Sequence, residues 1–335
     1  MRVIKNIIIC IIISLIIQLS GLFYIDNFFL DSSFALKSQK IVDLMTNAKI
    51  NIPNNALNIN TSFDAAYIAY YLNNELFVVD TKSGKSTNLS YSNNIKVSFY
   101  KWLPDRNRIL IAEKDKNNLS ISYYDIDKGQ MDNITKFPML SSKSEVVDIV
   151  ASPLINVIYI KVENGPQRVS VYWVNVMKSE KRISTRTNNI GNIEAIPHED
   201  KMVYENLTDN MIYATGSRSA LEFNGTTKLS LLKVDNNDMV YIGAIDNNNN
   251  INKIYFGTLN ENTASWGVLN FGIPVNRNNL FITASGAVYV NNNLKGTITD
   301  INTGKGLAYR GSFLQLYSDG IASLNKGTLV KTLFK

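Results

Sequence analysis

Few side chains in this sequence have both the type and the spacing that chemistry needs. The 335 residues include one histidine, His198, and one cysteine, Cys10. One residue of each kind is too few for a clustered zinc or haem site, a CxxC redox pair or a disulfide framework. Most classes of metal and cofactor enzyme are therefore excluded, and we expect the protein to use no metal and no cofactor.

Two short patterns match parts of known ligand-binding motifs. Gly84-Lys85-Ser86 resembles the end of a phosphate-binding loop, but Val79 stands where such a loop needs a glycine. Asp125-x-Asp127-x-Gly129 resembles the start of a calcium loop, yet the third oxygen ligand and the closing Glu of an EF-hand are missing. We interpret both patterns as hairpin turns, with a weak calcium site as the alternative for the second.

His198 belongs to no recognisable catalytic set. A Ser-His-Asp triad needs a serine on a sharp elbow, and the sequence contains no G-x-S-x-G pattern. The 28 acidic residues are scattered, without the pairing that carboxylate catalysis would need. We therefore predict that the chain is not an enzyme. No catalytic, cofactor-binding or metal-binding residue is assigned, and the binding residues are unknown at this level.

The residues just discussed lie within an internal repeat. Seven segments, each a polar turn that opens an apolar run, can be aligned with their second residues at positions 63, 104, 153, 197, 235, 276 and 318. A period of about 42 residues is that of a four-stranded propeller blade. The segments are Ser62–Ala69, Leu103–Leu110, Ser152–Tyr159, Ile196–Val203, Val234–Tyr241, Val275–Ile282 and Tyr317–Ala322.

A second marker, Asp-x-x-x-Gly after an apolar run, recurs in phase with the first. It occurs at Asp80–Gly84, Asp125–Gly129 and Asp300–Gly304, with weaker turn chemistry at Asn175–Ser179 and Thr258–Asn262. Glycine adopts the left-handed backbone of a tight hairpin, and aspartate caps such a turn. The runs between markers are short and rich in Ile, Val, Tyr and Phe, which predicts strands rather than helices.

The last repeat has room for only three strands, at Phe313–Tyr317, Ile321–Leu324 and Leu329–Phe334. A fourth strand from the segment Ile41–Leu57 would complete this blade and cover two sheet edges. Within that segment, Ile50-Asn51-Ile52 alternates as a half-buried strand does, and Pro53 limits its length. We therefore predict that the N-terminal segment closes the ring.

The repeats resemble a known family. Ser62 to Asp80, which reads SFDAAYIAYYLNNELFVVD, and Trp102 to Asp125, which begins WLPDRNRILI, look like the blade motif of TolB-like and other WD-like propellers. They are also similar to the propellers of dipeptidyl peptidase IV-type and prolyl oligopeptidase-type enzymes. The resemblance implies an all-β propeller that serves as an interaction platform, and without a hydrolase domain it implies no catalytic residues. Family members commonly have six blades, whereas the spacing here favours seven.

A membrane segment precedes the repeats. The twenty residues from Asn6 to Ile25 carry no charge and are long enough, as a helix, to cross a bilayer. Arg2 and Lys5 lie before them, which predicts a cytoplasmic N-terminus and an extracytoplasmic body. We predict a signal anchor at residues 1–30, a linker at 31–40 and the propeller at 41–335. The alternative is secretion after cleavage of a signal peptide at Ser33-Phe34-Ala35.

The exported part contains no cysteine, since Cys10 lies in the predicted anchor, and this is typical of bacterial envelope proteins with a large core. The net charge of +6 includes no basic tract, so nucleic acid is not an expected partner.

Trp102, Trp173 and Trp266 are predicted to lie mostly in the core, and the alternative places one or two at the mouth of the channel. We predict a membrane-anchored platform that binds a protein or peptide of the bacterial cell envelope. The alternative is a module that binds a cell-wall or surface glycan.

Overall fold

The computed structural model describes residues 49–73, 75–89, 96–152 and 154–334, together with residues 6, 14, 15 and 17–20. The chain divides into two compact units, Met1–Ala48 and Lys49–Lys335. In the first unit the described residues are helical. The predicted anchor at 1–30 falls largely, and the linker at 31–40 entirely, outside the described residues. Among those that are described, no helix is both long and apolar enough to cross a membrane.

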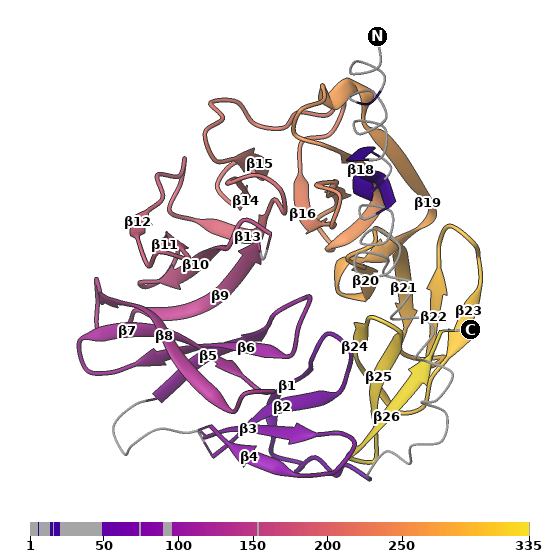
Figure 1. Cartoon of the computed structure of the whole chain (residues 1–335). Helices are drawn as coiled ribbons and strands as arrows, with labels where there is room; N and C mark the ends of the chain where they lie inside the picture. The colour runs from indigo at the N-terminus through magenta and orange to yellow at the C-terminus, as the bar shows by residue number, and fades with distance from the viewer. Residues whose placement is uncertain are drawn as a thin grey trace. The chain divides into compact units, whose positions relative to one another are not determined.

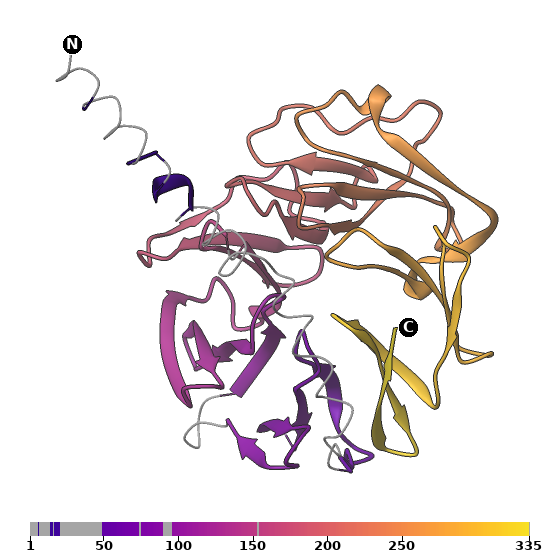
Figure 2. The same cartoon turned by 45° about the vertical axis from the view of Figure 1, so that its right-hand side comes forward.

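The described residues from 49 to 334 form seven antiparallel sheets that follow one another around a ring (Figures 1 and 2). Within each sheet the strands lie in the order in which they occur in the chain, so each sheet is a meander of hairpins. This is a seven-bladed β-propeller. The all-β prediction and the larger of the two predicted blade counts are confirmed.

Over the described residues, five blades have four strands, and blades 4 and 7 have three. Blade 1 contains β1 (Leu57–Thr61), β2 (Tyr67–Leu72), β3 (Glu75–Asp80) and β4 (Ser86–Asn88); blade 2 contains β5 (Lys96–Trp102), β6 (Arg108–Lys114), β7 (Asn118–Asp125) and β8 (Gln130–Pro138). Blade 3 contains β9 (Glu145–Ser152), β10 (Val157–Glu163), β11 (Val169–Asn175) and β12 (Glu180–Arg182); blade 4 contains β13 (Ile190–Ala195), β14 (Met202–Asn206) and β15 (Met211–Ala214). Blade 5 contains β16 (Leu229–Val234), β17 (Val240–Ile245), β18 (Asn250–Gly257) and β19 (Gly267–Asn276); blade 6 contains β20 (Leu280–Ile282), β21 (Val288–Asn292), β22 (Thr297–Asp300) and β23 (Gly306–Ala308). Blade 7 contains β24 (Ser312–Tyr317), β25 (Gly320–Asn325) and β26 (Thr328–Leu333).

The hairpins between the third and fourth strands have the predicted geometry. Gly84, Gly129 and Gly304 have φ values of 74°, 63° and 68°, in the left-handed region that glycine adopts without strain. The Asp80 carboxylate accepts hydrogen bonds from the backbone N–H groups of Lys82 at 2.7 Å and of the next residue at 3.0 Å. The Asp-x-x-x-Gly marker therefore identified these turns correctly.

The repeat segment predicted for blade 6 is wrong. Asn276 in that segment caps a short 3-10 helix, η4 (Arg277–Asn279), which precedes the first strand of the blade. The turn between the first two strands is instead 283–287, where the Thr283 N–H donates to the Ala287 carbonyl at 3.0 Å and Gly286 has a φ of 82°. Asn caps helices as readily as it opens turns, and this ambiguity caused the error.

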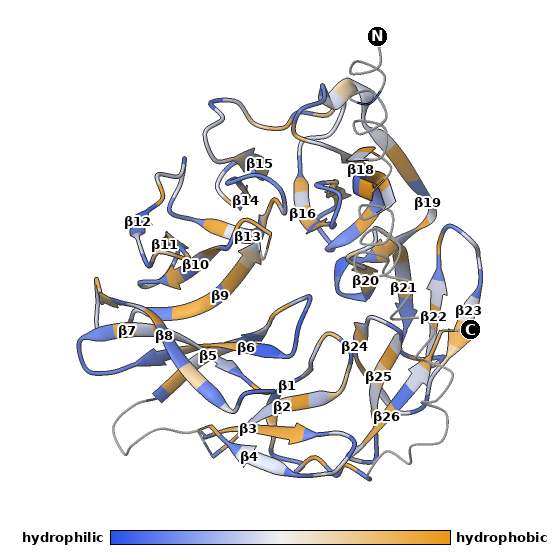
Figure 3. Cartoon of the chain, viewed as in Figure 1, coloured by the Kyte–Doolittle hydropathy of each residue, from blue (hydrophilic) through white to orange (hydrophobic). Residues whose placement is uncertain are grey.

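Buried apolar side chains of neighbouring blades form shared core clusters. Figure 3 shows hydrophobic residues along many of the strands. The second strand of a blade lies inside its sheet and faces a neighbouring blade on each side, so its residues are buried on both faces. In β6, the five residues from Ile109 to Glu113 are buried, and all five residues of β14 are buried. These runs therefore lack strict alternation of apolar and polar residues, although each also buries a glutamate, Glu113 in β6 and Glu205 in β14.

A buried carboxylate joins blade 4 to blade 5 and to the connection between blades 5 and 6. Glu205 on β14 is 3% exposed. Its Oε1 accepts hydrogen bonds from the Ser230 hydroxyl at 2.9 Å, the Leu231 N–H at 2.7 Å and the Arg277 guanidinium at 3.1 Å, and Oε2 accepts from the Asn192 N–H at 2.7 Å. Four donors satisfy this charge, as a buried carboxylate requires.

Residues 50–52 lie antiparallel to the start of β26, at the fourth-strand position of blade 7. The Ile52 N–H donates to the Gly327 carbonyl at 2.7 Å, and the Leu329 N–H donates to the Ile50 carbonyl at 2.9 Å. Asn51 forms an isolated antiparallel bridge with Thr328. Ile50 and Ile52 are each 5% exposed. Part of the edge of the three-stranded sheet is thereby covered.

Candidate functional site

His198 lies in the turn between β13 and β14, on the surface. Its Nδ1 atom lies 3.1 Å from both carboxylate oxygens of Asp238, and its backbone N–H donates to the same carboxylate at 3.0 Å. These contacts join blade 4 to blade 5. The histidine therefore holds two blades together, and no serine or cysteine takes part in the contacts that the structure gives it.

The two partial motifs are hairpin turns, as interpreted from the sequence. In the second, Asp125 accepts a hydrogen bond from the Arg108 guanidinium at 2.7 Å and one from the Lys128 N–H at 3.2 Å. The Arg108 contact lowers the pKa of Asp125. Within the described part of the chain, no group of three or more His, Cys, Asp or Glu side chains is arranged to hold a metal ion.

The tryptophans are mostly core residues. Trp102 and Trp266 are buried, at 9% and 6% exposure. Trp173 is half-buried, donates from Nε1 to Asp200 at 2.7 Å and lies under the ammonium of Lys181, 4.3 Å from its ring centroid. Each of the three rings is thus either buried or held by contacts within the propeller.

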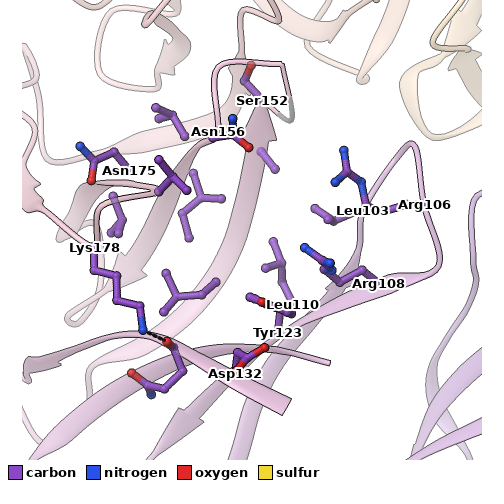
Figure 4. A pocket seen from close by; sticks show the side chains of 17 residues that line it. Leu103, Arg106, Arg108, Leu110, Tyr123, Asp132, Ser152, Asn156, Asn175 and Lys178 are labelled. Carbon is purple, nitrogen blue, oxygen red and sulfur yellow. Dashed lines mark hydrogen bonds between the residues drawn. The ribbon is translucent and has the colours of Figure 1, made fainter. Parts of the chain in front are cut away.

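A cleft of about 350 Å³ opens between blades 2 and 3, and we call it the 2–3 cleft (Figure 4). Its volume is in the range of pockets that bind ligands. The floor is aliphatic and comes from both blades, with Leu103, Leu110 and Ile134 on one side and Val157, Ile158 and Val174 on the other. Several of these residues also belong to the core between blades 2 and 3, so the floor of the cleft is the border of that core, with Ile134 and Ile158 only partly buried.

One lip of the cleft carries two arginines. The Arg108 guanidinium stacks on the Tyr123 ring, with Cζ 4.3 Å from the centroid. A hydrogen bond to Asp132 raises the pKa of Tyr123. Arg106, further out on this lip, donates from Nε to Asp105 at 3.0 Å. These polar groups fix the lip in place around the aliphatic floor.

The other lip carries Lys178, in the hairpin between β11 and β12. Its backbone has a φ of 61°, in the left-handed region where glycine stands in the hairpins of blades 1, 2 and 6. Its ammonium crosses the cleft and donates to the Asn133 carbonyl at 2.7 Å (Figure 4). Among the described residues it forms no ion pair with a carboxylate. It is therefore a cation held on a neutral acceptor at the mouth of the cleft.

Three large apolar side chains beside this lip face solvent. Val176 is 69% exposed, Met177 is 79% exposed and Leu154, in the turn between β9 and β10, is 61% exposed. Val176 itself lines the cleft, and the other two are close in sequence to lining residues. Exposed apolar side chains thus lie on the rim of blade 3, next in sequence to residues that line the cleft. Clusters of this kind mark interaction sites more often than isolated exposed side chains do.

The sequence did not reveal this site. The cleft depends on how far two blades separate at their border, and that separation is set by side chains about 40 residues apart, as in one propeller repeat. One signal was present: the hairpin of blade 3 has Met177 and Lys178 where the hairpins of blades 1, 2 and 6 place polar residues and glycine. The hairpin isoleucines of blades 2 and 6, Ile126 and Ile301, pack against the core, whereas Val176 and Met177 are exposed.

No family model matches this chain, and no curated protein matches it. Solved structures do match: a chain of the crystal structure of the mitotic checkpoint complex aligns with a TM-score of 0.55 and 11% sequence identity, over 87% of this chain and 95% of that chain. The two share a propeller fold. TolB from Acinetobacter baumannii aligns with a TM-score of 0.44 and 17% identity, over 74% of this chain and 64% of that chain. At such low identities the likeness shows the fold alone, and the TolB match adds nothing to that conclusion.

Proposed function

We propose that this chain is a non-catalytic binding platform that holds a polypeptide segment of a partner protein in the 2–3 cleft. The observation that carries the proposal is the aliphatic cleft together with the exposed apolar rim of Leu154, Val176 and Met177. Covering such a surface with an apolar side chain of a partner is favourable, because it removes apolar area from water. A glycan offers mainly hydroxyl groups and would leave this surface poorly matched.

The charges at the mouth define the partner further. Lys178 now donates to a neutral backbone carbonyl, and a carboxylate is a stronger acceptor for an ammonium. A partner segment with an apolar side chain for the floor and an Asp or Glu close to it would satisfy both features. The proposed ligand is therefore an acidic segment with one large aliphatic or aromatic anchor.

The proposal is tested with the full-length chain in detergent. Peptides selected from a random display library are measured by fluorescence polarisation against wild type, Met177→Asp and Lys178→Met. Leu294→Asp is the matched control, because Leu294 is 100% exposed on a hairpin of blade 6. We expect selected peptides to contain an apolar anchor and an acidic residue, with binding at least about tenfold weaker for Met177→Asp, which is about 1.4 kcal/mol.

Lys178→Met should weaken only the peptides that carry the acidic residue, and the control should bind like wild type. Selected peptides that bind Met177→Asp and the control equally well would place the binding site outside the cleft. They would then contradict the proposal.

We further propose that the platform works on the outer side of a bacterial cell membrane, held there by residues 6–25. Support comes from the sequence: a twenty-residue uncharged stretch follows Arg2 and Lys5. Protease added to intact cells should digest the propeller, and a carbonate wash should leave the undigested protein in the membrane. Mature protein that starts at Leu36 in the medium would show cleavage instead of anchoring.

A further inference from the structure

A second hollow of about 440 Å³ lies among the first strands of blades 1, 2, 3 and 7, and we call it the channel pocket. Its lining comes mainly from β1, β5, β9 and β24, which surround the centre of the ring (Figure 1). None of its lining residues is shared with the 2–3 cleft. What it binds is therefore a separate question from the function proposed above.

The lining of the channel pocket is electrically balanced. Its two charged residues are Lys101 and Asp148, and the ammonium lies 2.7 Å from the carboxylate Oδ1. The pair is only partly buried, with the two side chains 42% and 27% exposed. A free anion would meet the carboxylate and a free cation would meet the ammonium, so the pocket favours an uncharged ligand.

The pocket also holds unused hydrogen-bonding capacity. Both bonds that the structure gives the Asp148 side chain end on Oδ1, which leaves Oδ2 open among the described residues. The Asn60 amide donates through Nδ2, and its Oδ1 accepts nothing from the described part of the chain. Asn58, in an irregular part of β1 with a φ of 49°, makes no side-chain hydrogen bond within that part. A bulge of this kind often redirects a side chain toward a ligand.

Four aromatic residues, Tyr71, Phe99, Tyr100 and Trp102, also line the pocket. The Phe99 ring is half-buried and offers an apolar surface beside the Lys101 and Asp148 pair. The Tyr71 hydroxyl is buried and has no hydrogen-bond partner among the described residues, and a buried polar group in that state is costly. The Gln315 amide, in contrast, is fully used, because it donates to and accepts from Thr61 and so joins blade 7 to blade 1.

From these features we propose that the channel pocket binds a neutral sugar ring. Adjacent hydroxyl groups both donate and accept, so they can donate to Asp148 and Asn60 while accepting from the remaining N–H groups of Lys101. The C–H face of the ring can lie on Phe99. An apolar ligand would leave the same polar groups without water or a partner, at a cost in free energy.

The test uses the full-length chain and saturation-transfer NMR with glucose, galactose, mannose and N-acetylglucosamine. Inorganic phosphate and choline serve as charged probes. We expect saturable binding of at least one sugar and none of either charged probe. Asp148→Ala should weaken that binding about tenfold, the loss of one hydrogen bond to a charged group. Asn58→Gly should weaken it as well. Because this side chain is exposed and unbonded in the fold, and because glycine adopts the φ of 49° without strain, this variant separates ligand binding from folding.

Met177→Asp, on the rim beside the 2–3 cleft, is the matched control and should bind the sugar like wild type. If no peptide binds the cleft but a sugar binds the channel pocket, the channel proposal holds and the cleft proposal is wrong. If peptides bind the cleft but no sugar binds, the cleft proposal holds and the channel proposal is wrong. The channel proposal is overturned if none of the four sugars binds. It is also overturned if phosphate or choline binds as well as the sugar, or if the Asp148 and Asn58 variants both bind like wild type.

Discussion

The closing segment of the ring can be tested with one buried side chain. Ile52 is 5% exposed and stands where residues 50–52 cover the edge of β26. Ile52→Ala leaves the backbone hydrogen bond to the Gly327 carbonyl possible but removes three carbon atoms from a packed site. Truncation of a buried isoleucine to alanine costs about 2–5 kcal/mol. Because this segment lies at the outer edge of a blade and can relax, we expect about 2–3 kcal/mol.

Leu57 provides the matched control, since it is an aliphatic residue of the same region that is 67% exposed. Leu57→Ala should change the free energy of unfolding by less than about 0.5 kcal/mol. Thermal unfolding of the full-length chain, followed by tryptophan fluorescence, should show the Tm of Ile52→Ala lowered by roughly 4–6 °C, at about 2 °C per kcal/mol for a domain of this size.

Hydrogen exchange gives a second and more local reading of the same variant. The Leu329 N–H donates to the Ile50 carbonyl, so its protection should fall when the closing segment detaches more often. We expect peptides that cover β26 to exchange faster in Ile52→Ala than in Leu57→Ala. Equal Tm values and equal exchange in the two variants would refute the reasoning, because the ring would then be stable without this segment.

Three further predictions concern single residues. Glu205→Ala leaves four donors without their acceptor, two of them on the buried residues Ser230 and Leu231, and should cost about 3–5 kcal/mol in urea unfolding. The exposed Glu163→Ala should cost almost nothing. Gly129→Val should lower the free energy of unfolding by about 1–2 kcal/mol because of the φ of 63°, and Gly129→Asn should cost less; equal Tm values for Gly129→Val and wild type would contradict this. Hydrogen bonds, above all from the Asn117 backbone N–H, lower the pKa of Asp115 to about 2. The ionised Asp115 carboxylate therefore stabilises the fold fully above its unfolded pKa near 4, and this stabilisation is lost as the pH falls through about 2. In acid titrations, Asp115→Asn should therefore lose less stability than wild type between pH 4 and pH 2.

The propeller itself was predictable because local chemistry repeats in every blade. A left-handed hairpin backbone selects glycine, and Gly84 and Gly129 therefore marked two blades directly in the sequence. The polar turns after the first strands gave the same period. The error at Val275–Ile282 shows the limit of this reasoning, since Asn276 caps a 3-10 helix with the same side-chain oxygen that would stabilise a turn.

The sites were not predictable in the same way. Lys101 and Asp148 meet in the channel pocket across 47 residues of sequence, and nothing in either local segment marks the partner. The 2–3 cleft likewise depends on the spacing between two sheets. Blade 4 departed from the expected four strands for a similar reason, because its outer edge is reduced to a single bridge between Ile212 and Leu221. Contacts between distant segments decide such details.

At position 178, backbone stability and the charge at the mouth of the 2–3 cleft favour different residues. A residue with a side chain costs about 1 kcal/mol more than glycine in the left-handed region, and three other blades have glycine in the corresponding hairpin. Selection for heat resistance alone would therefore favour glycine at position 178. Selection for an ammonium at the mouth of the 2–3 cleft would favour lysine. A laboratory evolution experiment would separate these pressures at this one codon, and the residue that survives would report which of them the host imposes.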